Sequence, residues 1–108
     1  MVRKERDITI LNLDLDKINE DVISDMVLEA EEILRKYIVK SVGDKLVSDL
    51  DVTIIVDKDD KLTFTIDAAF SAPKLLELDY DNIIDAAIRE AARTIEKRLM
   101  KYVKKRTM

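Results

Sequence analysis

The residues best suited to bind a ligand lie at the C-terminal end of the chain, where cations gather. Residues 89–108 carry eight basic and only two acidic side chains. Clustered cations bind phosphate groups, and an aromatic ring among them can stack on an unpaired base. The alternative is that these cations match the negative end of a helix dipole and otherwise lie in solvent. The nucleic-acid candidate comprises Lys97, Arg98, Lys101, Tyr102, Lys104, Lys105 and Arg106.

A second group of candidate ligands is formed by the carboxylates in the middle of the chain. Asp57, Asp59 and Asp60 are spaced like the start of a calcium-binding loop. Such a loop requires a glycine at its sixth position and a bidentate glutamate at its twelfth. Leu62 and Ala68 occupy those positions. The sequence therefore predicts a solvated turn and no metal site.

The composition excludes most catalytic chemistries. The chain has no histidine and no cysteine, so it lacks the usual general base near neutral pH and any thiol nucleophile. A single glycine rules out a glycine-rich loop around phosphates. Adjacent carboxylates such as Glu31 and Glu32, or Asp49 and Asp51, are expected by chance among 23 acidic residues. The sequence therefore predicts a protein that is not an enzyme, with no catalytic residue, no cofactor and no metal.

The element that organises the chain is a hairpin formed by residues 50–56 and 62–70. In the second run, apolar residues alternate with threonine, aspartate or alanine, a period of two that is typical of a half-buried strand. The turn at 57–61 lacks the Asn-Gly pair of a tight hairpin, so we expect a loop of four or five residues. Pro73 follows the second strand and cannot continue it.

A helical pattern precedes the hairpin and another follows it. Apolar residues recur at helical spacing over 18–38, where Asp14 and Asp16 are the predicted N-caps, and over 83–103, where Asp79 and Asp81 are. Gly43 is expected to end the first helix in the left-handed conformation. The first apolar stripe covers roughly 200° of the helix, more than a small sheet can bury. Part of it is therefore expected to lie against another subunit.

These elements predict one small α+β domain over residues 1–108. The predicted order is αββα, with both helices on one face of a small antiparallel sheet and the other face more open. Residues 7–13 are β-branched and partly alternating, and form either a leading strand (βαββα) or an extended arm. Because a two-stranded sheet is marginal alone, we expect the chain to dimerise by its sheet edges or open faces, with itself or with another small subunit.

The overall composition indicates a cytoplasmic protein from a hyperthermophile. Charged residues make up 39% of the chain, as in proteins that use ion-pair networks at high temperature. No apolar run approaches the roughly 20 residues that span a bilayer, and the charged residues 1–6 are not followed by the apolar segment of a secretory signal. We therefore expect no membrane partner.

Several blocks of the sequence resemble a small archaeal family of unknown function, whose genes often neighbour that of the prefoldin beta subunit. The resemblance runs from about Leu13 to Met100. It is carried by Arg35-Lys36-Tyr37-Ile38, by residues 49–54 and 62–66, by Ser71-Ala72-Pro73 and by Ile84-Asp85-Ala86-Ala87.

The helix–hairpin–helix order also resembles, at the level of the fold, the small dimerising subunit of the KEOPS complex. That complex makes threonylcarbamoyladenosine in tRNA, and the resemblance implies a dimerising accessory subunit without an active site. The last helix of that family typically carries Leu-Arg-Ala followed by Asn-Ser. Residues 84–92 do not have this pattern, so no binding residue transfers.

Three functional hypotheses follow from the sequence. The first is a non-enzymatic interaction and dimerisation module, an accessory partner of the tRNA threonylcarbamoyladenosine machinery. The second is an RNA-binding protein that uses its basic C-terminal helix. The third is a factor associated with prefoldin or another chaperone, to which the gene neighbourhood of the family points.

Overall fold

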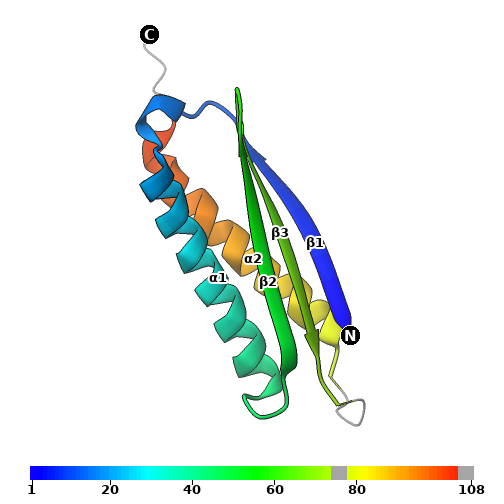
Figure 1. Cartoon of the computed structure of the whole chain (residues 1–108). Helices are drawn as coiled ribbons and strands as arrows, with labels where there is room; N and C mark the ends of the chain where they lie inside the picture. The colour runs from blue at the N-terminus through cyan, green and yellow to red at the C-terminus, as the bar shows by residue number, and fades with distance from the viewer. Residues whose placement is uncertain (74–77, 105–108) are drawn as a thin grey trace.

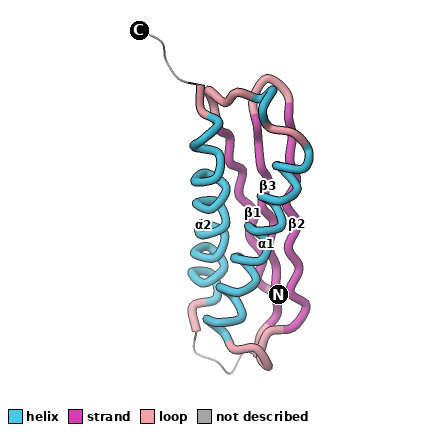
Figure 2. Tube along the Cα trace, turned by 90° about the vertical axis from the view of Figure 1, so that its left-hand side faces the viewer, coloured by secondary structure: helices cyan, strands magenta, loops and turns pink. Residues whose placement is uncertain are grey.

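The computed structural model describes residues 1–73 and 78–104 and has the predicted α+β architecture. Two helices cover one face of a three-stranded antiparallel sheet, so the molecule has two layers and an elongated shape (Figures 1 and 2). The elements in chain order are β1 (Val2–Ile10), α1 (Glu20–Val42), β2 (Ser48–Lys58), β3 (Leu62–Ser71) and α2 (Tyr80–Leu99). Two short 3-10 helices, Leu15–Lys17 and Met100–Tyr102, precede α1 and follow α2.

The second strand of the predicted hairpin, β3, is the centre of the sheet. The strand order is β1-β3-β2, so both other strands pair with β3 and each leaves one edge free. The predicted alternation is confirmed, because the side chains of β3 that face the helices have no exposed surface: Leu62, Phe64, Ile66, Ala68 and Phe70. The three residues between β2 and β3 form a shorter loop than the predicted four or five.

The leading strand exists, but it begins five residues before the predicted start. It runs from Val2 to Ile10, so the alternative prediction, that this segment is an extended arm, is wrong. The charged run at its start resembled a solvated tail, yet Arg3 pairs with Asp67 of β3 across the open face of the sheet. The strand ends before the predicted residue 13, because Asn12 turns the backbone with φ 61°. Leu13 then forms a single bridge with Val103.

The N-cap predicted for the first helix is wrong, whereas one of those predicted for the second is confirmed. Leu15–Lys17 form a separate 3-10 turn, so α1 starts later, and the side chain of Asn19 caps it by accepting from the Val22 N–H at 2.9 Å. Asp79 caps α2 by accepting from the Asn82 N–H at 3.1 Å. Asp81 lies in the first turn of α2.

Gly43 ends α1 as predicted, although with a different backbone conformation. Its N–H donates to the Val39 carbonyl at 2.8 Å. Its φ of 116° is positive, as expected for a glycine C-cap, but its ψ of 133° lies far from the left-handed helical value. A turn over residues 44–46 follows, in which the Leu46 N–H donates to the Gly43 carbonyl at 3.0 Å, and this turn leads into β2.

The helices are antiparallel and pack closely on each other and on the sheet (Figures 1 and 2). Small buried residues of α2, Ala87, Ala91 and Ala92, permit this close approach. On α1 a single row of side chains is buried: Met26, Ala30, Leu34, Ile38 and Val42. The flanks of the wide stripe stay partly accessible, with Tyr37 36% exposed, and Leu28, which lies outside the stripe, is 62% exposed.

Candidate functional site

The predicted nucleic-acid residues lie at one end of the molecule but do not form one continuous cationic surface. Lys97 and Arg98 are in the last turn of α2, Lys101 and Tyr102 are in the following 3-10 helix, and Lys104 comes just after it. The remaining two predicted residues, Lys105 and Arg106, lie outside the described part of the chain.

Arg98 is already engaged by carboxylates of the other helix. Its two terminal nitrogens donate to Glu29 and Asp25 of α1 at 2.6 and 2.7 Å. The hydrogen bond to Asp25 is the main cause that raises the pKa of Arg98 above its ordinary value; burial opposes this shift, and the hydrogen bond to Glu29 adds to it. This guanidinium links the two helices, so a phosphate group would have to compete with two carboxylates for it.

Tyr102 also makes contacts that hold the fold together. Its ring is half-buried against the hydrophobic core, and its carbonyl accepts from the Asp14 N–H at 2.8 Å. The Lys101 ammonium lies 5.4 Å from the centre of the ring, within the range of a cation–π contact. The exposed cations of the predicted site in the described part of the chain are therefore Lys97, Lys101 and Lys104.

We expect Arg98→Met to lower the free energy of unfolding by about 1 kcal/mol or less, because exposed ion pairs contribute little each. The loss should shrink as salt is added, since salt screens surface charges. Chemical denaturation at two salt concentrations measures both effects. Arg93→Met is the matched control, because Arg93 pairs with Glu90 within α2. Equal losses for both variants would contradict a structural role of the link between the helices.

The paired carboxylates do not converge on a desolvated site. Glu31 is half-buried on α1 and Glu32 is exposed beside Lys36, 2.8 Å away, which lowers the pKa of Glu32 through a hydrogen bond. Every fully buried side chain in the described residues is apolar. Within the same residues no group of three acidic side chains is placed to hold a metal ion, and neither helix is long and apolar enough to cross a membrane.

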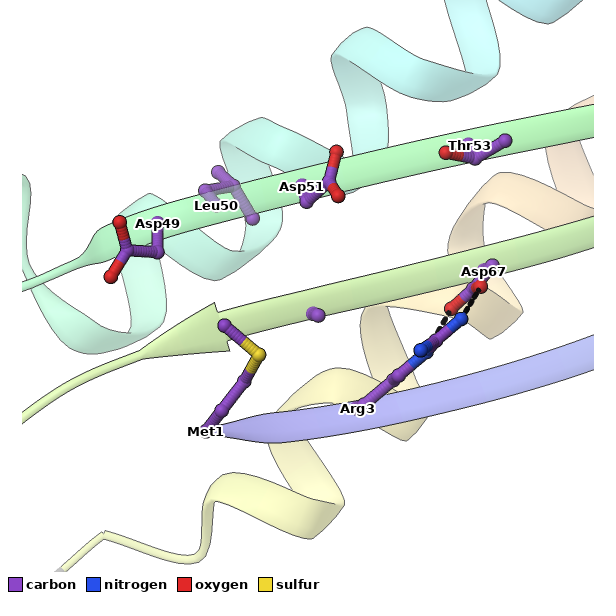
Figure 3. Close-up of a pocket in the computed structure, with 8 residues that line it drawn as sticks. Met1, Arg3, Asp49, Leu50, Asp51, Thr53 and Asp67 are labelled. Carbon is purple, nitrogen blue, oxygen red and sulfur yellow. Dashed lines mark hydrogen bonds and ion pairs between the residues drawn. The ribbon is translucent and has the colours of Figure 1, made fainter.

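A shallow hollow of about 540 Å³ lies on the open face of the sheet, where Ala69 provides no side-chain bulk (Figure 3). Arg3 and Asp67 point toward each other on one side of it, with Arg3 Nε 3.1 Å from Asp67 Oδ1. Asp49 and Asp51 line the other side, on β2.

The hydrogen bond from Arg3 lowers the pKa of Asp67 below its ordinary value. A lowered folded-state pKa means that this ion pair stabilises the fold at neutral pH, and that its contribution disappears as the pH falls through that pKa.

The open face as a whole is acidic. Register places Arg3, Glu5, Asp7 and Thr9 of β1 on this face, together with the threonines and Asp67 of β3. From β2 it receives Asp51, Thr53, Ile55 and Asp57. The five carboxylates on this face outnumber its one cation, and Ile55 is 60% exposed among them. The prediction that this face is the more open one is confirmed.

The free edge of β1 has charges that disfavour pairing with an uncharged strand or with a second copy of itself. Lys4 and Arg6 lie opposite Ala68 and Ile66, and so are on the helix-facing side of the sheet. Lys4 reaches Asp81 of α2 at 3.3 Å. Inward-pointing charges on an edge strand are a common device against edge-to-edge association.

The free edge of β2 has no such protection along its central part. Its helix-facing residues between Asp49 and Asp57 are all apolar: Leu50, Val52, Ile54 and Val56. The edge is irregular only near its start, where the register shifts between Ser48 and Asp51 and Asp49 has a φ of 53°. The signal was present in the sequence as the run Val52-Thr53-Ile54-Ile55-Val56, but only the strand order shows that this run forms an edge.

A second apolar surface, which the sequence analysis missed, lies where β1 and α2 end. Leu11, Met100 and Val103 are 65%, 69% and 41% exposed. They line a groove of about 440 Å³ together with residues of β1 and the last turn of α2. Val103 belongs to the apolar helical pattern in the sequence, which predicted its burial, whereas Met100 does not belong to that pattern.

Comparison with known proteins connects this fold to archaeal relatives. The chain is 24% identical over 83 residues to an uncharacterised protein of Thermococcus kodakarensis, covering 73% of this chain and 77% of that protein. It is 23% identical over 95 residues to an uncharacterised protein of Pyrococcus horikoshii, covering 88% and 82%.

Two solved structures share the fold. A crystal structure from Thermococcus onnurineus matches with a TM-score of 0.73 and 23% identity over 94% of this chain and 95% of that one. The solution structure of a hypothetical protein from Methanothermobacter thermautotrophicus matches with a TM-score of 0.70 and 26% identity, over 85% of this chain and 100% of that one. The model of the family described as "Protein of unknown function (DUF3194)" matches residues 15–98, and the chain therefore belongs to this family, as the resemblance to an archaeal family of unknown function implied.

Proposed function

We propose that this chain is a non-enzymatic interaction module that forms a homodimer through the free edge of β2. The observation that carries the proposal is the contrast between the two edges of the sheet. The edge of β1 has two cations on its helix-facing side, whereas that of β2 has only apolar residues from Leu50 to Val56. From Val52 to Val56 the β2 edge is uncharged and β-branched, and such an exposed stretch favours association unless another strand covers it.

The β2 edge is complementary to a second copy of itself. In an antiparallel pair, residues opposite each other point to the same face of the sheet. A second β2 therefore places helix-facing residues only against helix-facing residues, which in this stretch are valine, isoleucine and leucine. Pairing centred on Ile54 brings Val52 opposite Val56 of the second copy and Thr53 opposite Ile55, with Asp51 opposite Asp57 at the two ends of the paired stretch. The two sheets then form one continuous sheet.

Dimerisation through the open faces is disfavoured by charge. Five carboxylates and a single arginine occupy that face, so two such faces bring like charges together. Edge pairing centred on Ile54 opposes only Asp51 and Asp57, once at each end, whereas face pairing brings five carboxylates of each copy together. Of the two routes that the sequence left open, edges or faces, the distribution of charge therefore favours the edge.

The positions of the titratable groups support a function without catalysis. Catalytic carboxylates owe their shifted pKa values to burial and to groups placed around a cleft. Among the described residues, the groups with a shifted pKa are Arg3, Glu32, Asp67 and Arg98, and each is shifted chiefly by a surface ion pair.

Ile55→Glu is expected to raise the dissociation constant of the dimer at least tenfold, which corresponds to about 1.4 kcal/mol. Any antiparallel register near Ile54 puts the new carboxylate close to Asp51 or Asp57 of the partner, or to its own counterpart. Ile55 is exposed, so the fold of the single chain should persist. Light scattering coupled to size exclusion across micromolar concentrations measures the mass against the 12.5 kDa of one chain.

The control is Thr9→Glu, the same new charge on the open face but on the other edge strand. It should leave the dimer unchanged. A single-chain mass for the native protein at the highest micromolar concentrations would overturn the proposal, and so would equal weakening by the two variants.

For the wider assembly, we propose an accessory role beside the tRNA threonylcarbamoyladenosine machinery, supported by the resemblance to its small dimerising subunit. Affinity capture from the native lysate in low and high salt, read by mass spectrometry, tests this role. Recovery of those subunits in high salt would support it. Recovery of prefoldin subunits would point to a chaperone factor instead, and RNA lost at high salt would point to the three exposed lysines at the basic end.

A further inference from the structure

We propose that the groove between the end of β1 and the end of α2 binds an extended segment of another protein, which adds a strand to the free edge of β1. The groove is lined by Ile8, Ile10, Leu11, Leu99, Met100 and Val103. It lies at the end of the molecule where β1 finishes (upper end in Figure 1). This groove borders β1, at the opposite edge of the sheet from β2.

The first argument is the combination of a free strand edge with an apolar groove. β1 pairs with β3 on one side, and the backbone groups of its other side have no strand partner in the described part of the chain. Peptides that extend a sheet gain affinity from backbone hydrogen bonds and specificity from pockets for alternate side chains. Leu11 and Met100, 65% and 69% exposed, provide such a pocket directly beside the edge.

The second argument is that the groove is preformed. Its two walls are joined by the bridge between Leu13 and Val103 and by the Lys104 N–H, which donates to the Asn12 carbonyl at 2.7 Å. A surface held by backbone hydrogen bonds loses little conformational freedom when it binds a ligand, which favours affinity.

The third argument concerns the charge of the partner. The helix-facing side of β1 reads Lys4, Arg6, Ile8 and Ile10, so the edge has a basic half and an apolar half. Lys4 is neutralised by Asp81 and Asp85 of α2, whereas Arg6 is exposed and takes part in none of the ion pairs among the described residues. A bound strand should therefore place apolar side chains opposite Ile8 and Ile10, and an acidic side chain opposite Arg6.

A second copy of this chain does not meet that requirement. Because opposite residues share a face, Arg6 meets only helix-facing residues of an added strand. The helix-facing side of β1 has no carboxylate, and neither has that of β2 between Leu50 and Lys58. In every register of β1 or β2, a second copy thus leaves Arg6 against an apolar or basic residue, whereas an extended segment of a different protein can supply the acid.

Two synthetic seven-residue peptides with blocked ends test the inference. Each peptide has threonine at its odd positions. In the peptide designed for antiparallel binding, leucine, valine and glutamate fill the even positions in that order. In the peptide designed for parallel binding, they fill the even positions in the reverse order. We expect one of them to shift the backbone amide resonances of Thr9, Ile10 and Leu11 in the native protein. Leu11→Lys should weaken its binding at least tenfold, whereas Leu28→Lys, an equally exposed leucine on α1, should not.

A charge exchange makes the test specific. Arg6→Glu should weaken binding of the glutamate peptide and strengthen that of the same peptide with lysine in place of glutamate. Ile55→Glu should leave peptide binding unchanged, so this site is tested independently of the proposed dimer. Absence of amide shifts at Thr9–Leu11 with both peptides at millimolar concentration would overturn the inference. A loss of the native dimer in Leu11→Lys would do the same, because it would identify a second copy as the occupant.

Discussion

Replacing Phe64 by alanine is expected to remove about 3–5 kcal/mol from the free energy of unfolding, the usual cost of emptying a large aromatic site in a core. Phe64 has no exposed surface and lies at the middle of the sheet, between Ile8 of β1 and Val56 of β2. A domain of this size has about 5–15 kcal/mol of stability in total, so this one change removes a large fraction of it. Urea denaturation followed by circular dichroism measures the loss.

Thr65→Ala provides the matched control on the next residue of the same strand. Thr65 lies on the open face, where its hydroxyl donates to Asp7 at 2.8 Å, so its loss should cost only about 1 kcal/mol. Ile66→Val, which removes one buried methyl group, should cost about 0.5–1.5 kcal/mol and gives a measurable value if Phe64→Ala does not fold. Similar losses at Phe64 and Thr65 would contradict the assignment of the core to the helix-facing side of β3.

Gly43→Ala is expected to cost about 1–3 kcal/mol, because an alanine would be held in a backbone region that side chains rarely adopt. The strain comes from the φ of 116° and not from crowding. A Cβ at this position would lie 3.4 Å from Leu46 Cδ1, an ordinary contact distance.

The control for Gly43 is Ser41→Ala, an exposed change in the last turn of α1 that should stay within about 0.5 kcal/mol. Thermal and urea denaturation of both variants make the comparison. If Gly43→Ala were as stable as the native chain, the turn between α1 and β2 would have to adopt another conformation in solution.

The sequence predicted the parts of the fold that depend on local patterns. The alternation from Leu62 to Phe70 correctly identified the buried face of β3, and helical spacing correctly identified both helices. The start of β1 was missed because Arg3, Lys4 and Arg6 resemble a solvated tail unless their position at a sheet edge is known. The N-cap of α1 was misplaced because aspartates at 14 and 16 are good caps by type, whereas the tertiary path of the chain selected Asn19.

The candidate surfaces were less predictable because they depend on contacts between distant residues. Nothing near Arg98 in the sequence indicates that Asp25 and Glu29 occupy its guanidinium. Likewise, the run from Val52 to Val56 fits a central strand as well as an edge. Its importance for association follows only from the order β1-β3-β2, in which the third strand, and not the second, becomes the centre of the sheet.

That strand order also has a consequence for the synthesis of the protein. β1 leaves the ribosome before β3, its strand partner among the described residues, and Ser71, the last residue of β3, lies about two thirds of the way along the chain. The residues from β1 to the end of β3 take several seconds to translate, and β1 has no strand to pair with during that time. Five consecutive charged residues, from Arg3 to Asp7, keep this waiting segment hydrated. The charges that made β1 hard to recognise as a strand in the sequence thus also disfavour premature association of the nascent chain.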